Sequence, residues 1–288
     1  MKNILALAIF MQALFISCVS KAPGQETEAT VKPTQIEKKN DNQEKPTKAT
    51  AADIAVILAR KEVPVLCYHQ IRDWAPIDGN RAKDDIISPA RFKEHIKMLA
   101  DSGYHSILPD QLYDYLVYGK DLPTKPIMFT FDDTDLDQFT VAYPTLKQYG
   151  FKGVYFIMTV AIGKKGRIDY MNAEQIKTLS DDGNVIASHT YDHKNFARFN
   201  EKDWLIQIEE PNKKLERITG KKIEYFAYPY GVFKSSNLHR LKDYGFKMAF
   251  ILSTKRDEQY PLFTIRRIID PGYYTTRGLM NSIKKSFK

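Results

Sequence analysis

The chain of 288 residues contains only two cysteines, Cys18 and Cys67, so a framework of disulfides cannot supply its stability. Its apolar run over residues 4–16 is shorter than the about 20 residues that a membrane-spanning helix needs. No block of Lys and Arg interleaved with aromatic residues accompanies the net charge of +8, so nucleic acid is not an expected partner. The composition, 43% apolar and 27% charged, is that of a globular protein with its own core.

The first residues have the pattern of an export signal, with Lys2 as a positive start and residues 4–16 as the apolar run. This run ends at Cys18 after a small residue, which resembles the bacterial lipoprotein cleavage box, although Phe15 stands where Leu is usual. The resemblance implies a signal peptide over residues 1–17 and lipidation of Cys18. The protein would then be exported and anchored by lipid to a membrane of the bacterial cell envelope. An ordinary signal peptide with an incidental cysteine is the alternative.

The next segment, residues 18–52, is rich in Pro, Thr, Gln, Glu, Lys and Asn and nearly devoid of large apolar side chains. Such a segment cannot bury enough surface to offset the entropy of ordering, so we expect a disordered tether. One large domain is expected over residues 53–288, with Cys67 as its only thiol.

From residue 63 onward, short apolar runs alternate with longer amphipathic segments, which predicts strands followed by helices around a parallel sheet. Either a (β/α) barrel or a doubly wound sheet fits this α/β pattern. In both folds the reactive side chains gather where the strands end. The predicted strands are residues 64–68, 125–131, 153–158, 184–188, 224–227 and 246–252, and the predicted helices are residues 89–102, 140–149, 173–182, 201–219 and 236–244.

Two adjacent carboxylates, Asp132 and Asp133, directly follow the apolar run of residues 127–131. A charged group at the end of a buried strand costs folding free energy unless it is paired with an opposite charge or has a functional role. A helix N-cap is the structural alternative, because Asp is a common cap residue.

Two imidazoles, His189 and His193, follow the predicted strand over residues 184–188 at a spacing of four. If one helical turn separates them, they share a face and can bind one divalent ion. The pair alone is a weak signal, but a carboxylate pair at the end of another strand strengthens it. Two His and one Asp leave coordination positions open for water and substrate, as in a catalytic metal site.

A third polar segment leads from the apolar strand over residues 224–227 into an aromatic turn, Tyr228-Pro229-Tyr230. Such a turn can present a backbone N–H and a ring to a sugar. A plain strand-to-helix turn built on Pro and Gly is the alternative.

Taken together, these segments resemble the polysaccharide deacetylase family, also described as the NodB homology domain or carbohydrate esterase family 4. The resemblance spans residues 63–271 and implies a distorted (β/α) barrel with fewer than eight regular strands. The first and last motifs look especially like the branch that trims poly-N-acetylglucosamine exopolysaccharide. The matching motifs, in the family's order, are residues 68–71 (YHQI), 130–133 (TFDD), 188–193 (SHTYDH) and 228–231 (YPYG).

The resemblance implies a metal-dependent hydrolase that removes acetyl groups from a polysaccharide, most often the N-acetyl groups of N-acetylglucosamine units. Asp132 would be the catalytic base. The metal would be Zn by first expectation, although Co, Ni and Fe also accept two His and a carboxylate. Its ligands would be Asp133, His189 and His193. Peptidoglycan and O-acetylated xylan are alternative substrates.

The resemblance also assigns the substrate and oxyanion contacts to Tyr228, Pro229 and Tyr230, with the backbone N–H of Tyr230 as the oxyanion donor. The sequence indicates nothing about the oligomeric state.

Two departures from the family pattern bear on activity. An Arg that orients the base usually stands just before the Pro-Tyr-Gly turn, and this chain has Ala227 there. A late His usually acts as general acid, and no His follows His239. We predict His69, at the end of the first strand, as the substitute acid. Candidate replacements for the orienting groups are Arg266, Arg267 and Asp270.

These departures motivate one rival hypothesis, a non-catalytic glycan-binding lipoprotein with a degenerate deacetylase fold. The adjacent pair Asp132 and Asp133 argues against it, because a pure binder does not need a base beside a metal ligand. A serine hydrolase is disfavoured, since no Gly-x-Ser-x-Gly motif follows a strand.

Overall fold

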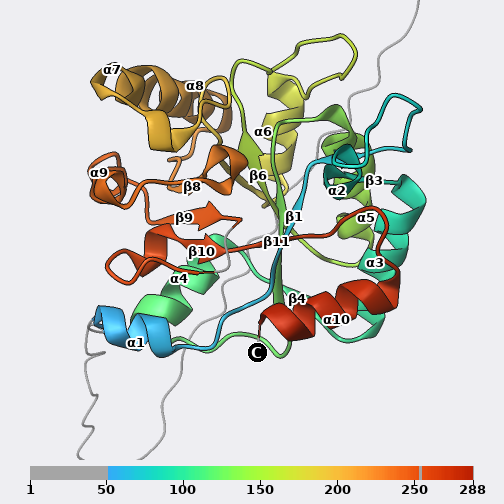
Figure 1. Ribbon diagram of the computed structural model, residues 1–288, viewed down its shortest axis with the longest axis horizontal. Coiled ribbons are helices and arrows are strands. Elements are labelled where there is room, and N and C mark those ends of the chain that lie inside the picture. The colour runs from blue at the N-terminus through green and yellow to red at the C-terminus, as the bar shows by residue number, and fades with distance from the viewer. Residues whose placement is uncertain (1–50, 253–254, 288) are drawn as a thin grey trace, which may run out of the picture. The chain divides into compact units, whose positions relative to one another are not determined.

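The computed structural model describes residues 51–252 and 255–287, and most of its strands belong to one parallel sheet that curls into a nearly closed barrel (Figure 1). The strands of this sheet are β1 (Val65–Tyr68), β4 (His105–Ser106), β5 (Pro126–Phe131), β6 (Gly153–Ile157), β7 (Val185–Ser188), β8 (Tyr225–Ala227), β9 (Met248–Ile251), β10 (Ile265–Arg266) and β11 (Ile268–Ile269). Their order is β10-β9-β8-β7-β6-β5-β1-β11, and β4 pairs with the first residues of β5. The predicted distorted barrel with fewer than eight regular strands is confirmed, because β10 and β11 have only two residues each.

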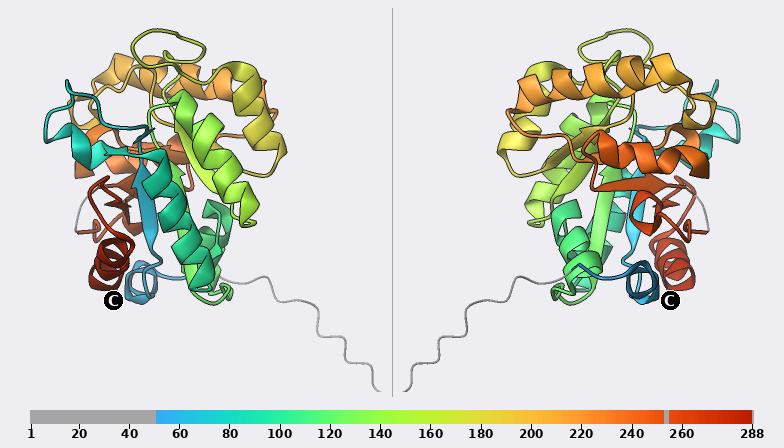
Figure 2. Two further views of the ribbon diagram at one scale, coloured as in Figure 1. Left: turned by 90° about the vertical axis from the view of Figure 1, so that its right-hand side faces the viewer. Right: turned by 90° about the vertical axis from the view of Figure 1, so that its left-hand side faces the viewer.

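Helices pack around the sheet and close one end of it (Figure 2). A second, two-stranded sheet is formed by β2 (Gln70–Ile71) and β3 (Ile86–Ile87). The helices are α1 (Ile54–Ala59), α2 (Ala82–Asp85), α3 (Pro89–Asp101), α4 (Pro109–Tyr118), α5 (Tyr143–Gln148), α6 (Ala173–Asp181), α7 (Glu201–Asp203), α8 (Glu210–Thr219), α9 (Leu238–Asp243) and α10 (Thr276–Ser286).

The predicted helices are present, with two irregularities that the periodicity did not indicate. The predicted helix over residues 201–219 contains a π-helical stretch, Trp204–Glu209, between α7 and α8. A similar stretch, Gln138–Ala142, precedes α5. Local sequence explains the regular helix starts: Ser88 caps α3 ahead of a proline at the first helical position, and Asn172 forms a capping box in α6.

The strands separate two apolar cores because alternate side chains point to opposite faces of a sheet. One core lies between the sheet and the surrounding helices. The other fills the barrel, and α1 and α4 cover the end where the strands begin (Figure 2). Side chains that share this inner core include Ile57, Val65, Leu112, Leu116, Met128, Phe156, Ala227 and Phe250.

The two edges of the sheet come together at one residue. In the strand order β10 and β11 stand at opposite ends, yet only Arg267 separates them in the sequence. The backbone N–H of Arg267 donates to the carbonyl of Ile251 in β9, and its side chain is buried. Closure of the barrel therefore places a guanidinium group among the ends of the strands.

Among residues 51–252 and 255–287, no helix is both long and apolar enough to cross a membrane. The predicted signal peptide, the lipidation site Cys18 and most of the tether lie outside the described residues and stay predictions.

Candidate active site

Side chains from separate strands converge on a cleft of about 650 Å³ at the carboxyl ends of the strands. Asp132 and Asp133 follow β5, and His189 follows β7. The backbone N–H of His189 still donates to the carbonyl of Ile157 in β6. The turn after β8 brings Tyr230 to the same cleft. Parallel pairing explains this convergence, since the carboxyl ends of all these strands lie at one edge of the sheet.

Three potential metal ligands lie at the centre of the cleft. Asp133 Oδ1 is 3.4 Å from the Nε2 atoms of both His189 and His193, and all three atoms lie within 4.8 Å of one another. Buried Asp133 Oδ1 and His189 Nε2 make no hydrogen bond of good geometry. Unpaired buried polar atoms are costly, so their convergence fits a site for a divalent cation.

A neighbouring hydrogen bond orients the buried imidazole. His189 Nδ1 lies 2.8 Å from the carbonyl oxygen of Ala227, where it donates its proton and leaves Nε2 free toward Asp133. Metal-binding histidines commonly have such a partner on the second ring nitrogen, because it fixes both tautomer and ring orientation. Burial lowers the pKa of His193, and repulsion by His189 lowers it further. A neutral imidazole is the form that binds metal.

The backbone around these groups is strained. Non-glycine residues with positive φ are rare, because Cβ crowds the backbone in that region, and they concentrate at functional sites. In the described parts of the chain, all but one of them lie in this cleft or beside it: Asp133, Thr134, Thr190, His193 and Tyr230, with Lys125 as the exception.

Asp132 forms a buried ion pair with Arg267, which closes the barrel. The guanidinium donates to both carboxylate oxygens, at 2.7 and 2.8 Å, and neither side chain is more than 2% exposed. Burial raises the pKa of Asp132, but the charge and hydrogen bonds of Arg267, together with the charges of His189 and His69, outweigh burial and lower it. Asp132 is therefore an ionised, fixed acceptor, and Arg267 supplies the orienting contact that Ala227 cannot make.

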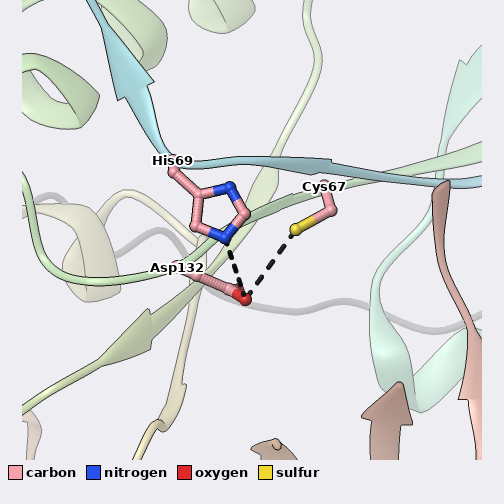
Figure 3. Close-up of side chains that lie close together, drawn as sticks. All are labelled: Cys67, His69 and Asp132. Atoms are coloured by element: carbon pink, nitrogen blue, oxygen red, sulfur yellow. Dashed lines mark hydrogen bonds and ion pairs between the residues drawn. The ribbon is translucent and has the colours of Figure 1, made fainter. Parts of the chain in front are cut away.

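His69 lies next to this carboxylate, as Figure 3 shows. Its Nε2 is 3.9 Å from Asp132 Oδ2, and its Nδ1 is 3.5 Å from Asp85 Oδ1. His189 Nε2 is also 3.9 Å from Asp132 Oδ2, so that oxygen lies between two imidazoles. The position agrees with a proton-transfer role for His69, which stays a prediction.

Cys67, His69 and Asp132 form a second group with possible ligand atoms, and Cys67 Sγ is 3.8 Å from Asp132 Oδ2 (Figure 3). This group fits a metal poorly. Both oxygens of Asp132 already bind Arg267, and burial raises the pKa of Cys67 well above its usual value, which keeps the thiol protonated.

The aromatic turn is only partly exposed to the cleft. Tyr230 is 63% exposed, and its ring centroid is 4.4 Å from that of His193. Tyr228 is fully buried and donates its hydroxyl to the carbonyl of Phe263, and Pro229 is also buried. Of the three residues predicted to contact substrate, the structure thus brings only the side chain of Tyr230 to the cleft.

Comparison with known proteins agrees with this geometry. Residues 119–249 match the family model described as polysaccharide deacetylase. A Bacillus subtilis protein named for that family, YxkH, is 28% identical over 245 residues, covering 84% of this chain and 80% of its own. The poly-β-1,6-N-acetyl-D-glucosamine N-deacetylase of Staphylococcus aureus is 28% identical over 210 residues, covering 66% of this chain and 72% of its own. Residues 119–249 therefore belong to a polysaccharide deacetylase domain.

Solved structures share the fold of this deacetylase domain. IcaB from Ammonifex degensii aligns with a TM-score of 0.65 at 25% identity, over 80% of this chain and 98% of that one. The Streptococcus pyogenes deacetylase PplD, solved in complex with acetate, aligns with a TM-score of 0.69 at 21% identity, over 79% of this chain and 98% of that one.

The sequence predicted most residues of the cleft of this deacetylase domain, but it did not determine the partners of Asp132 and His69. Arg267 was one of three late candidates, and only barrel closure shows that it is the one that reaches Asp132. Asp85, which faces His69, was not identified, because it ends the short helix α2, whose sequence carries no motif. Arg266 instead pairs with Glu62, and Asp270 bonds to the buried residues Tyr68 and His95.

Proposed function

We propose that this protein removes N-acetyl groups from N-acetylglucosamine units of a polysaccharide and that the reaction depends on a divalent metal ion. The observation that carries the proposal is the convergence of Asp133, His189 and His193 beside the ionised base candidate Asp132. The Staphylococcus aureus relative, named as a poly-β-1,6-N-acetyl-D-glucosamine N-deacetylase, supports the choice of substrate.

The three ligand residues would hold the metal through Asp133 Oδ1 and the two Nε2 atoms. A divalent ion in such a site polarises a carbonyl and lowers the pKa of water toward about 7. Zn, Co, Ni and Fe all accept this ligand set, and Zn is the first choice to test.

Asp132 would accept the proton of the attacking water. An ionised carboxylate has about four lone-pair directions. Arg267 uses two of them and the Cys67 thiol, 3.8 Å from Oδ2, uses a third, so one acceptor direction remains for the water. The guanidinium holds the carboxylate in place, which avoids reorganisation during the reaction.

His69 would donate a proton to the departing amine, because its Nε2 lies near Asp132 on the cleft side and no His follows His239 to fill the late position. The backbone N–H of Tyr230 would donate to the tetrahedral oxyanion, a contribution worth about 3 to 4 kcal/mol in other enzymes.

The proposed function is tested by measuring acetate release from β-1,6-linked N-acetylglucosamine oligomers, peptidoglycan and O-acetylated xylan. We expect release from the oligomers, loss of release after chelation, and recovery when Zn, Co or Ni is added back. Release from one of the other polymers would correct the substrate. If the metal-loaded protein released no acetate from any polymer, the glycan-binding hypothesis would replace this one.

Replacing His69 by Gln should lower kcat about 10²- to 10³-fold on amide substrates, because the amine leaves poorly without a proton. The loss should be much smaller on an aryl acetate, whose leaving group needs no proton. The matched control is His239→Gln, since His239 is exposed on α9 and does not line the cleft. Equal losses on both substrates would assign His69 a structural role.

We also propose export and lipid attachment at Cys18. Metabolic labelling with a radioactive fatty acid should mark the wild-type chain and not Cys18→Ser. Labelling of neither chain would favour the ordinary signal peptide.

A further inference from the structure

Two exposed aromatic side chains lie against the same short segment, residues 83–86, beside the cleft. Trp74, in the loop after β2, is 43% exposed, and Tyr273, in the turn after β11, is 56% exposed. Gly272 lets the two segments meet, because a Cβ there would clash with the carbonyl oxygen of Ile86 and lie 3.1 Å from Trp74 Cζ2. Its backbone N–H also donates to the carbonyl of Lys83 at 3.2 Å. We call Trp74 and Tyr273 the aromatic platform.

Hydrogen bonds hold both rings of the aromatic platform in place. Trp74 Nε1 donates to the carbonyl of Ile86 at 2.9 Å, and the Tyr273 hydroxyl donates to Asp84 Oδ1 at 2.9 Å. The ammonium of Lys83 lies 4.9 Å from the centroid of the indole ring. Because their polar atoms are already bonded, the rings can bind a ligand with little further loss of side-chain entropy.

The aromatic platform adjoins the cleft through α2 and β3. Ala82, Asp85 and Ile86 line the cleft, whereas Lys83 and Asp84 contact the platform. The same four-residue helix therefore separates the two sites, and a helix with its side chains is about 10 Å across. A polymer of a few sugar units can reach across that distance.

We propose that the aromatic platform binds a second sugar residue of the polysaccharide while the unit to be deacetylated lies at Asp132. One face of a pyranose ring carries C–H groups that pack on an aromatic ring by dispersion and hydrophobic burial. The hydroxyl groups at the edge of the sugar then meet the charged neighbours Lys83 and Asp84. This inference rests on the proposed function and adds a specificity for chain length.

The charged neighbours favour a sugar over a protein partner. The two rings and the charged side chains of Lys83 and Asp84 form a small patch that is both aromatic and charged. Stable protein interfaces instead bury about 800 Å² on each partner around an apolar centre.

Chain-length dependence tests the aromatic platform directly. In Trp74→Ala and Tyr273→Ala, KM for a β-1,6-linked N-acetylglucosamine hexamer should rise about tenfold, as expected for the loss of one aromatic contact. The kcat value and the activity on the dimer should stay unchanged, because the dimer is too short to occupy both sites. Tyr118→Ala is the matched control, since this exposed tyrosine ends α4 at the other end of the barrel.

A titration that needs no turnover separates failure of this inference from failure of the proposed function. The chain has two tryptophans, and Trp204 is buried and stacked on Tyr244, so an exposed indole signal comes from Trp74. In an Asp132→Asn background, the hexamer should change this fluorescence. Trp74→Phe should lose the signal but keep the affinity measured by calorimetry, and Trp74→Ala should lose both.

Two results would overturn the inference. The first is an equal fall in activity on dimer and hexamer in Trp74→Ala, which would mean that Trp74 only stabilises its loop. The second is hexamer affinity that Trp74→Ala leaves unchanged. Absence of acetate release from every polymer would reject the proposed function instead, and the titration would still decide whether the platform binds sugar.

Discussion

Asp132→Asn should lower kcat about 10²- to 10⁴-fold without loss of the proposed metal, because the amide cannot accept a proton and the three proposed ligands are untouched. His189→Ala should lose both metal and turnover. Metal content measured by elemental mass spectrometry, together with acetate release, distinguishes the two variants. Full activity in Asp132→Asn would reject the assignment of the base.

The stability of this variant needs its own control. Asp132→Asn leaves the guanidinium of Arg267 buried without its counter-charge, and breaking a buried pair on one side costs about 3 to 5 kcal/mol. The double variant Asp132→Asn/Arg267→Met removes that unpaired charge. We expect its thermal midpoint to recover toward wild type while turnover stays absent, which separates the chemical effect from the folding effect.

Arg267→Lys should lower kcat about 10²-fold with little change in KM or metal content. Lysine keeps the charge but cannot donate to both oxygens of Asp132 from a planar group, so the base loses its fixed position. KM should be insensitive because Arg267 does not line the cleft. Steady-state kinetics on N-acetylglucosamine oligomers measures both values.

The neighbouring Arg266 provides a matched control for this substitution. Its guanidinium pairs with Glu62 rather than with a residue of the cleft. Arg266→Lys should therefore leave kcat within about twofold, as is usual for partly exposed ion pairs. Equal effects of the two substitutions would mean that Arg267 only closes the barrel.

The ion pair of Asp132 and Arg267 weakens the hypothesis of a non-catalytic glycan-binding protein. The hypothesis rested in part on Ala227, which stands in place of the usual arginine, but the structure shows another arginine, Arg267 between β10 and β11, bound to Asp132. A buried pair of this kind contributes little net stability compared with apolar packing. Its presence beside the proposed metal ligands supports the proposed role of Arg267, which is to orient Asp132 as the base.

Local sequence was sufficient to predict the strands and the residues that follow them. The apolar run before Asp132, the capped helices and the spacing of His189 and His193 are all local features. Because parallel strands end at a common edge, the carboxylates and imidazoles were expected to meet, and they do. The fold class and the ligand cluster were therefore determined by the sequence.

Contacts between distant segments were decided by the tertiary structure. Arg267 reaches Asp132 because the sheet closes at β10 and β11, and two-residue strands carry too little periodicity to predict that closure. Trp74 lies beside the segment that carries Tyr273 because Gly272 allows a close backbone approach. Such pairings depend on the register and curvature of the whole barrel, which no local pattern encodes.

The aromatic turn shows the same limit within three residues. From the sequence alone, Tyr228 and Tyr230 are equally good candidates for a substrate contact, since both are aromatic and follow a strand. Positive φ at Tyr230 turns its ring outward, while Tyr228 continues into the core and bonds to Phe263. The sequence by itself thus determined which segments reach the site, and the tertiary structure decided which side chains face it, because backbone torsions and barrel closure set their directions.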